Sequence, residues 1–183
     1  MRSVADFYQD CIAAVDQQPP LDVQLADAVS CVLAEDVRAP FNLPVADLAA
    51  CDGYAVRASD CSRAALDAPV TLPVTEEIRA GVVDPAALVP GTAIRIASGA
   101  PVPAGADAVV ALEFTDHGVA EVGVRSAPAV GENIRRRAED VAEGQVVLRS
   151  GARVGARQVA LLAGVGRSRV LVHPRPRVVV LSI

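Results

Sequence analysis

Residues 44–57, PVADLAACDGYAVR, are the most informative stretch of this chain. The first half is short, apolar and rich in turn-forming residues. The second half opens with Asp52-Gly53, a signal for a tight turn, and continues into Tyr54-Ala55-Val56, which has the pattern of a short strand. Two interpretations are open. One is an ordinary hairpin turn; the other is an aspartate held at a strand mouth, where it can ligate a hard cation or accept a substrate hydrogen bond.

The chain from residue 41 to residue 130 consists of short β-like runs separated by Pro and Gly. The Asp116-His117-Gly118 segment has the composition of a hairpin turn between the last two runs. The spacing of the runs predicts a small β domain, barrel-like or sandwich-like. The runs are residues 54–57, 70–74, 77–80, 93–97, 108–112 and 119–124.

Both flanks of this β-rich region combine helices and strands. Ser3, with Asp6 three residues later, predicts the cap of an N-terminal helix, and a second helix is expected over residues 27–34. The sequence thus predicts an α+β fold, with a β-rich, barrel-like domain (41–140) inserted into a small α/β domain (1–40 and 141–174). The apolar positions of the first helix are Val4, Tyr8, Cys11, Ile12 and Val15. The remaining expected elements are strands at 21–25, from Val37, at 145–148 and at 170–172, and a helix at 156–163.

The C-terminal segment begins with a stiff linker marked by Pro174 and Pro176. A continuous apolar run follows over residues 177–181, which is typical of a buried parallel strand. The rest of the chain offers this run no parallel sheet to join. We therefore expect residues 175–183 to be the first strand of a further α/β domain that is truncated here.

Composition narrows the possible functions. The net charge is −5 and the pI is near 5.0, so no broad basic field is available for nucleic acid. No apolar run approaches the ~20 residues that span a bilayer, and the N-terminus lacks the apolar core of a signal peptide. The cysteines show neither CxxC pairs nor metal-type spacing, which favours reduced, buried thiols in a cytoplasmic protein. They are Cys11, Cys31, Cys51 and Cys61.

A second block, IRIASGAPVPAGADAVV (residues 94–110), places a hydroxyl at the end of a predicted strand. Ser98 follows the strand, and Gly99 beside it suggests a close approach of another group to the backbone. Such a loop can present the Ser98 hydroxyl and backbone N–H groups to an anion. The alternative is an ordinary exit from a strand into a Pro-rich turn.

A third block, GENIRRRAEDVAEGQVV (residues 131–147), contains three consecutive arginines followed by two acids. It can be a solvated turn that neutralises its own charges. Alternatively, the guanidinium groups of Arg135, Arg136 and Arg137 grip a phosphate while Asp140 addresses a metal ion. His117 and His173 have no signature beyond structural positions.

These three blocks, in this order and spacing, resemble the N-terminal half (domains I and II) of the MoeA/gephyrin E-domain family of molybdenum insertases. The resemblance covers nearly the whole chain. It implies that Asp52, Ser98 and Asp140 are active-site residues. It also implies that the residues 135–137 and Gly99 bind substrate.

The sequence departs from the family pattern at three places. The family usually shows N-S-A-M-D-G-Y-A, whereas this chain has L-A-A-C-D-G-Y-A at residues 48–55, which removes two polar groups and replaces Met by Cys51. The family Thr of T-G-A-P-V-P is Ser98, which keeps the hydroxyl. The family Gly of R-R-R-G-E-D is Ala138, which is expected to be tolerated only if the backbone there is not left-handed.

The resemblance also implies an activity for the complete protein. Family members insert molybdenum from molybdate into adenylylated molybdopterin, release AMP and depend on Mg²⁺, for which Asp52 and Asp140 are the candidate ligands. They act as homodimers whose cleft is shared between subunits, so the 183-residue chain alone is expected to be inactive. We expect Asp52 and Asp140 to converge at one rim of the β-rich domain, with Ser98 nearby.

Two alternatives to an enzyme remain open from the sequence. Eukaryotic members of the family also act as scaffolds, so the chain could be a protein-interaction module with reduced or no catalysis and a protein partner. The altered residues before Asp52 suit a relative that kept the fold and lost part of the chemistry. A purely structural dimerisation fragment is the third possibility.

Overall fold

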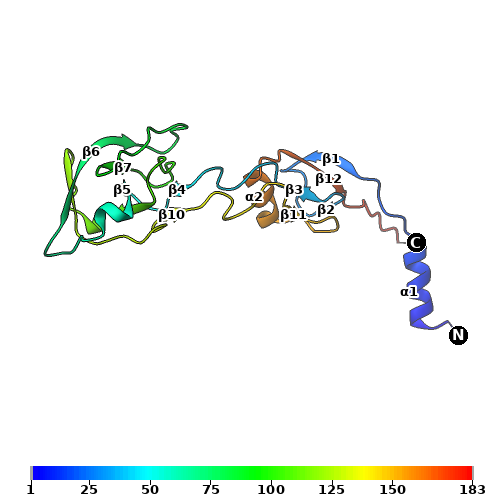
Figure 1. Cartoon of the computed structure of the whole chain (residues 1–183). Coiled ribbons are helices and arrows are strands. Elements are labelled where there is room, and N and C mark those ends of the chain that lie inside the picture. Colours follow the sequence, from blue (N-terminus) through cyan, green and yellow to red (C-terminus); the bar gives the residue numbers. More distant parts are fainter. Residues whose placement is uncertain (1, 183) are drawn as a thin grey trace. The chain divides into compact units, whose positions relative to one another are not determined.

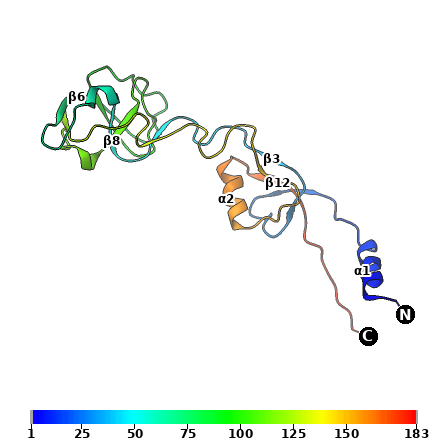
Figure 2. The same ribbon diagram turned by 60° about the horizontal axis from the view of Figure 1, so that its bottom comes forward.

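The computed structural model describes residues 2–182 and divides the chain into two compact units. One unit is Asn42–Ala142, and the other is formed by the chain on both sides of it. The described α-helices, α1 (Val4–Ala13) and α2 (Ala156–Gly164), both belong to the second unit (Figures 1 and 2). The fold is therefore of the predicted α+β class, with a β-rich unit inserted in sequence. The assignment of segments to particular family domains stays a prediction.

The inserted unit is built on a five-stranded sheet with the order β8-β5-β7-β6-β9. Next to the edge strand β8 (Ala108–Ala111), β5 (Gly53–Val56) pairs antiparallel with both β8 and the middle strand β7 (Ala93–Ile96). On the other side, β6 (Val70–Ile78) pairs parallel with β7 and antiparallel with β9 (Glu121–Val124). Two 3-10 turns, η1 (Ala58–Cys61) and η2 (Leu112–Phe114), follow β5 and β8.

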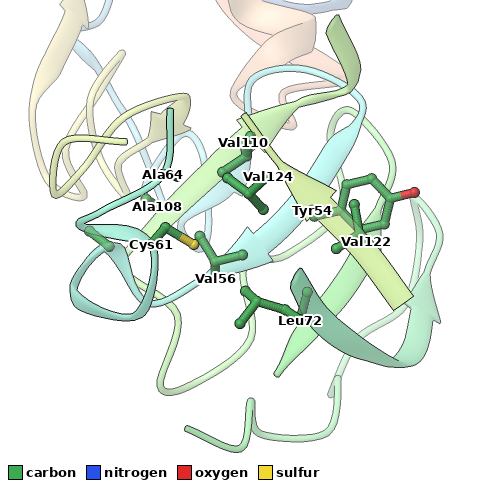
Figure 3. Close-up of a cluster of buried hydrophobic side chains, with 11 residues drawn as sticks. Tyr54, Val56, Cys61, Ala64, Leu72, Ala108, Val110, Val122 and Val124 are labelled. Carbon is green, nitrogen blue, oxygen red and sulfur yellow. The ribbon is translucent and has the colours of Figure 1, made fainter. Parts of the chain in front are cut away.

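Side chains on the two faces of this sheet form two separate cores, because alternate residues of a strand point to opposite faces. Tyr54 and Val56 belong to one core, around which the sheet curls (Figure 3), whereas Ala55 belongs to the other. All four residues of β5 are buried as a result. The first core also contains Leu72, Val110, Val122 and Val124, and the second contains Ile78, Leu88, Ile94, Ile96 and Val109.

The other unit holds two small antiparallel sheets. In the first, β12 (Arg169–His173) lies between β1 (Leu21–Gln24) and β2 (Val32–Leu33). In the second, β3 (Val37–Arg38) pairs with β11 (Val146–Leu148). The fully buried side chains of this unit include Leu33, Val37, Val154, Leu162 and Val172.

The helix predicted over residues 27–34 is wrong. The chain forms turns there and then enters β2, because Val32 and Leu33 pair with β12. Ser30 has a positive φ of 68°, which no α-helix contains, and its N–H donates to the Val154 carbonyl at 2.8 Å. Pairing with distant strands thus outweighed a helical pattern of only eight residues.

The predicted hairpin around Asp116-His117-Gly118 is wrong in its strand partners. The strands on either side, β8 and β9, lie at opposite edges of the sheet. The turn instead closes a short antiparallel bridge between Thr115 and Val124. The Asp116 carboxylate stabilises it by accepting hydrogen bonds from the N–H groups of Gly118 and Gly123 at 3.1 and 2.9 Å. These hydrogen bonds, that of Gly123 above all, lower the pKa of Asp116.

The separately predicted runs 70–74 and 77–80 are one strand, β6.

The ends of the described chain differ from expectation in their burial. The Ser3 capping box is confirmed, with Ser3 Oγ accepting from the Asp6 N–H at 3.1 Å. The apolar face of α1 is nevertheless exposed, at 88% for Val4 and 60% for Tyr8. In the described part of the C-terminal run, residues 174–182 belong to no strand and Val178 to Leu181 are exposed. That this run is the first strand of a further domain stays a prediction. Residue 183 lies outside the described residues.

A candidate site at the mouth of strand β5

Asp52 immediately precedes β5 and is exposed at its mouth. The hairpin interpretation of Asp52-Gly53 is wrong, because β5 pairs with β7 and β8 and not with the preceding β4 (Leu48–Ala49). Gly53 serves a different purpose: a Cβ at this position would lie 2.1 Å from the Val110 carbonyl oxygen. Glycine thus permits the close approach of β5 and β8 that fixes the backbone next to Asp52.

Asp52 and Ser98, 46 residues apart, meet at this point. The Ser98 N–H donates to Oδ1 of Asp52 at 2.7 Å, and the Ser98 hydroxyl donates weakly to the Ala50 carbonyl at 3.4 Å. The convergence of these two residues is confirmed, while their catalytic roles stay predictions. Gly99 was expected to allow a close approach, but a Cβ there would meet open space. Its φ of +76° gives the actual reason for glycine.

The three sequence blocks come together around β4. On one side, β4 pairs with β10 (Ile134–Arg135) of the third block. On the other side, its residue Leu48 bridges to Pro101 of the second block, and the Gly99 N–H donates to the Ala49 carbonyl at 2.9 Å. Since β4 leads through residues 50–51 into Asp52, the site is anchored to both other blocks.

A hollow of about 110 Å³ opens beside the Asp52 carboxylate. It is lined by Asp52, Gly53, Glu77, Arg95, Ala97 and Leu112, among others. Glu77 and Arg95 were not among the site residues predicted from the sequence. A signal for Arg95 was present, since a charged residue between Ile94 and Ile96 must point away from the core that buries these two. Nothing in the sequence indicated that this side chain lies next to Asp52.

The arginine block neutralises much of its own charge. Arg135 pairs with Asp140 at 2.6 Å, and Arg136 pairs with Asp47 at 2.7 Å. The Arg137 N–H donates to the second Asp47 oxygen at 2.8 Å, while the Arg137 side chain makes no ion pair within residues 2–182. The pKa of Asp47 is lowered, chiefly by the Arg137 N–H; partial burial opposes this shift and the Arg136 guanidinium supports it. Arg135 and Arg136 therefore fit the interpretation of this block as a turn that neutralises its own charges.

Asp140 lies in this second cluster. Its carboxylate binds Arg135, and its N–H donates to the Leu43 carbonyl at 2.9 Å. Within the described chain, no hydrogen bond or ion pair joins Asp140 to Asp52 or Ser98, and Asp140 does not line the hollow beside Asp52. The convergence of the two acids at one rim stays a prediction.

The backbone at Ala138 is left-handed, with φ of +64°. The expectation that alanine is tolerated only without a left-handed backbone is therefore wrong. The neighbouring contacts hold the strained residue: the Ala138 N–H donates to the Pro44 carbonyl at 3.0 Å, and the Arg136 N–H donates to the Glu139 carboxylate at 2.7 Å. Such a conformation costs a non-glycine residue roughly 1 kcal/mol.

The site offers oxygen ligands but no cage for a metal. No group of three or more His, Cys, Asp or Glu residues suited to a metal ion exists among residues 2–182. A magnesium ion fits here only in the manner common for phosphate-bound Mg²⁺, with one or two carboxylates, water and the substrate's own phosphates. The pKa of Cys51 is raised, first by burial and then by the charges of Glu113 and Asp52, so it remains a thiol.

The remaining cysteines and histidines have structural surroundings. Cys31 and Cys61 are buried as predicted, whereas Cys11 is exposed on α1. Burial raises the pKa of Cys61 to about 11. The His117 N–H donates to the Thr115 hydroxyl at 3.2 Å, and His173 Nδ1 lies 2.7 Å from the Gln18 carbonyl oxygen.

Comparison with known proteins supports what the three blocks suggested. A family profile described as the MoeA N-terminal region (domain I and II) matches residues 2–166. The chain therefore belongs to the MoeA family. Over its full length it is 46% identical to "Molybdopterin molybdenumtransferase 2" and 42% identical to "Molybdopterin molybdenumtransferase 1", both of Mycobacterium tuberculosis.

Solved structures agree with this assignment. The molybdopterin biosynthesis moeA protein of Pyrococcus horikoshii OT3 superposes with a TM-score of 0.81 and 36% identity, covering 90% of this chain and 45% of that one. The chain likewise spans 45% and 46% of the length of the two mycobacterial relatives. No helix among the described residues is long and apolar enough to cross a membrane.

Proposed function

We propose that this chain is the N-terminal part of a molybdenum insertase, which transfers molybdenum from molybdate to adenylylated molybdopterin in molybdenum-cofactor biosynthesis. Its two mycobacterial relatives are named molybdopterin molybdenumtransferases, which supports this class of reaction. The observation that carries the proposal is the Asp52–Ser98 hydrogen bond beside an open hollow, in a chain of this family.

The hydrogen bonds of the predicted site residues support a different proposed role for each of them. The Ser98 N–H occupies one carboxylate oxygen of Asp52, and the other has no hydrogen-bond partner among residues 2–182, so we propose that it binds Mg²⁺ or substrate. Ser98 supplies its hydroxyl, which makes only a weak hydrogen bond. Gly99 gives the loop its left-handed turn. Bound Mg²⁺ would neutralise the charge of the phosphoanhydride, with Asp52 and Asp140 as its protein ligands.

The arginine block contributes mainly through Arg137. Its guanidinium is available for a phosphate oxygen, whereas Arg135 and Arg136 hold Asp140 and the loop in place through their ion pairs. We therefore propose substrate binding by Arg137 and a positioning role for Arg135 and Arg136. We further propose that the complete protein works as a cytoplasmic homodimer and that the 183-residue chain alone does not release AMP.

The test is complementation of a strain that lacks its molybdenum insertase and therefore has no active molybdoenzymes. The complete open reading frame is expected to restore molybdoenzyme activity, and the same frame carrying Asp52→Ala is expected not to. Restoration by the Asp52→Ala variant at normal protein levels would contradict the proposed site. Failure of the unaltered frame, expressed and folded, would contradict the proposed function.

One observation favours a protein-interaction role as a second candidate. The apolar face of α1 is exposed, with Val4, Tyr8 and Ile12 each more than half accessible. In a scaffold this face would bind a partner protein. Replacing Tyr8 and Ile12 by Ser would then abolish capture of that partner while leaving complementation intact.

A further inference from the structure

Arg95 occupies a position on the sheet that directs its side chain to the Asp52 site. Its neighbours on β7, Ile94 and Ile96, are buried in one core, so Arg95 projects from the opposite face. On that face its register partners are Tyr54 of β5 and Glu77 of β6. Arg95 is thus fixed on a central strand and partly buried.

The positive charge of Arg95 is not neutralised. Within residues 2–182 its guanidinium makes no ion pair or hydrogen bond, although two acids are near. Glu77 pairs with Arg79 at 3.4 Å, and Asp52 accepts the Ser98 N–H. Arg135 and Arg136, by contrast, are each bound to a carboxylate. The charge of Arg95 is felt by Tyr54, whose pKa is raised by burial and lowered in part by Arg95.

Arg95 also borders open space on two sides. It lines the hollow of about 110 Å³ with Asp52 and Glu77, and a second hollow of about 210 Å³ with Val74, Thr75, Val119 and the acids Glu76 and Glu77. A guanidinium has five N–H donors in a planar fork and binds phosphate oxygens in pairs. A partly buried, unpaired guanidinium facing a hollow has the geometry of an oxyanion receptor.

We propose that Arg95 binds a phosphate group in the hollow beside Asp52. The phosphate belongs to a nucleotide ester; its identification with the adenylyl phosphate rests on the proposed function. The two acids do not oppose this binding strongly, because Arg79 offsets Glu77 and a backbone N–H partly satisfies Asp52. In the hollow next to Asp52, the phosphate is then bound by Arg95 and not by the arginine triplet at residues 135–137.

The test is calorimetric titration of the 183-residue chain with AMP in the presence of Mg²⁺. The variants are Arg95→Gln, Arg95→Lys and the control Arg63→Gln, which removes the same charge from an exposed position of the same unit but lines neither hollow. We expect the AMP Kd to weaken at least about tenfold for Arg95→Gln, less for Arg95→Lys and under about twofold for Arg63→Gln. Inorganic phosphate should compete with AMP, and adenosine should not.

Three results would overturn the inference: wild-type binding by Arg95→Gln, equal weakening by both Gln variants, or competition by adenosine alone. If Arg95→Gln does not fold, the Nε–H resonance of Arg95 in the unaltered chain decides. It should shift on addition of AMP, and an unchanged resonance at saturation refutes the contact. Loss of complementation by the unaltered reading frame would contradict the proposed function and leave phosphate binding by Arg95 standing.

Discussion

The mouth of β5 and the loop at residues 135–140 are both rich in charge, yet they use it differently. In the loop, Arg135 and Arg136 are bound to carboxylates of the same unit, and their charge holds the backbone in place. At the mouth of β5, Arg95 has no partner among the described residues, and Asp52 has one free oxygen beside a hollow. The difference shows that the most conspicuous run of like charges in a sequence is not always the group that binds a ligand.

The largest effect on stability is expected for Gly53→Ala, which tests how rigidly the mouth of β5 is built. The new Cβ would lie 2.1 Å from the Val110 carbonyl, so β5 and β8 must separate. We expect a loss of roughly 3 kcal/mol in the free energy of unfolding, measured by urea denaturation. Gly99→Ala, with open space around its Cβ but a φ of +76°, is the control and should lose only about 1 kcal/mol. Equal losses would contradict the role assigned to Gly53.

The next effect concerns Asp47, which fastens the arginine loop. Asp47→Ala removes hydrogen bonds to Arg136 Nη1 and to the Arg137 N–H, so we expect a loss of about 1 kcal/mol. Asp140→Ala, which breaks a single exposed pair, should lose no more than about 0.5 kcal/mol. A double-mutant cycle between Asp47 and Arg136 measures the coupling directly, and zero coupling would show that the loop does not depend on this pair.

The same residue predicts a pH dependence. The pKa of Asp47 is lowered in the folded state, so its stabilisation is complete above the unfolded value of about 3.9. It is lost as the pH falls through the lower folded value. The stability difference between the unaltered chain and Asp47→Asn should therefore shrink below about pH 4 and stay constant above pH 5. A constant difference across this range would exclude the charged form of Asp47 from the loop.

The smallest effect should come from Ala138→Gly, and its sign is opposite. Ala138 has a φ of +64°, which glycine adopts without strain. We expect a gain of at most about 1 kcal/mol, measured by thermal unfolding, because the greater freedom of glycine in the unfolded chain offsets part of the relief. Destabilisation would show that the left-handed backbone at Ala138 is not strained.

The sequence predicted those features that depend on local pattern. The alternation in Tyr54-Ala55-Val56 indicated a strand, and the Ser3 and Asp6 spacing indicated a capping box; both are confirmed. The meeting of Asp52 with Ser98 followed from the family resemblance and not from pattern alone.

Features that depend on distant pairing were missed. The parallel pairing of β6 with β7 sets Glu77 beside Arg95, and the pairing of β5 with β7 sets Arg95 beside Tyr54. Neither register is encoded in the neighbouring residues, so the placement of Arg95 at the site could not be predicted. The prediction of a helix over residues 27–34 failed for the same reason, because pairing with β12, more than 130 residues later, determines the structure there.

The central claim is that the chemistry depends on Asp52 at the mouth of β5. Its most direct test is the rate of AMP release from adenylylated molybdopterin, with molybdate and Mg²⁺, by the complete protein carrying Asp52→Asn. We predict a fall of at least about 100-fold with an unchanged urea midpoint, since Asp52 is exposed and the Oδ1 of asparagine can still accept the Ser98 N–H. A rate equal to that of the unaltered protein would contradict the claim.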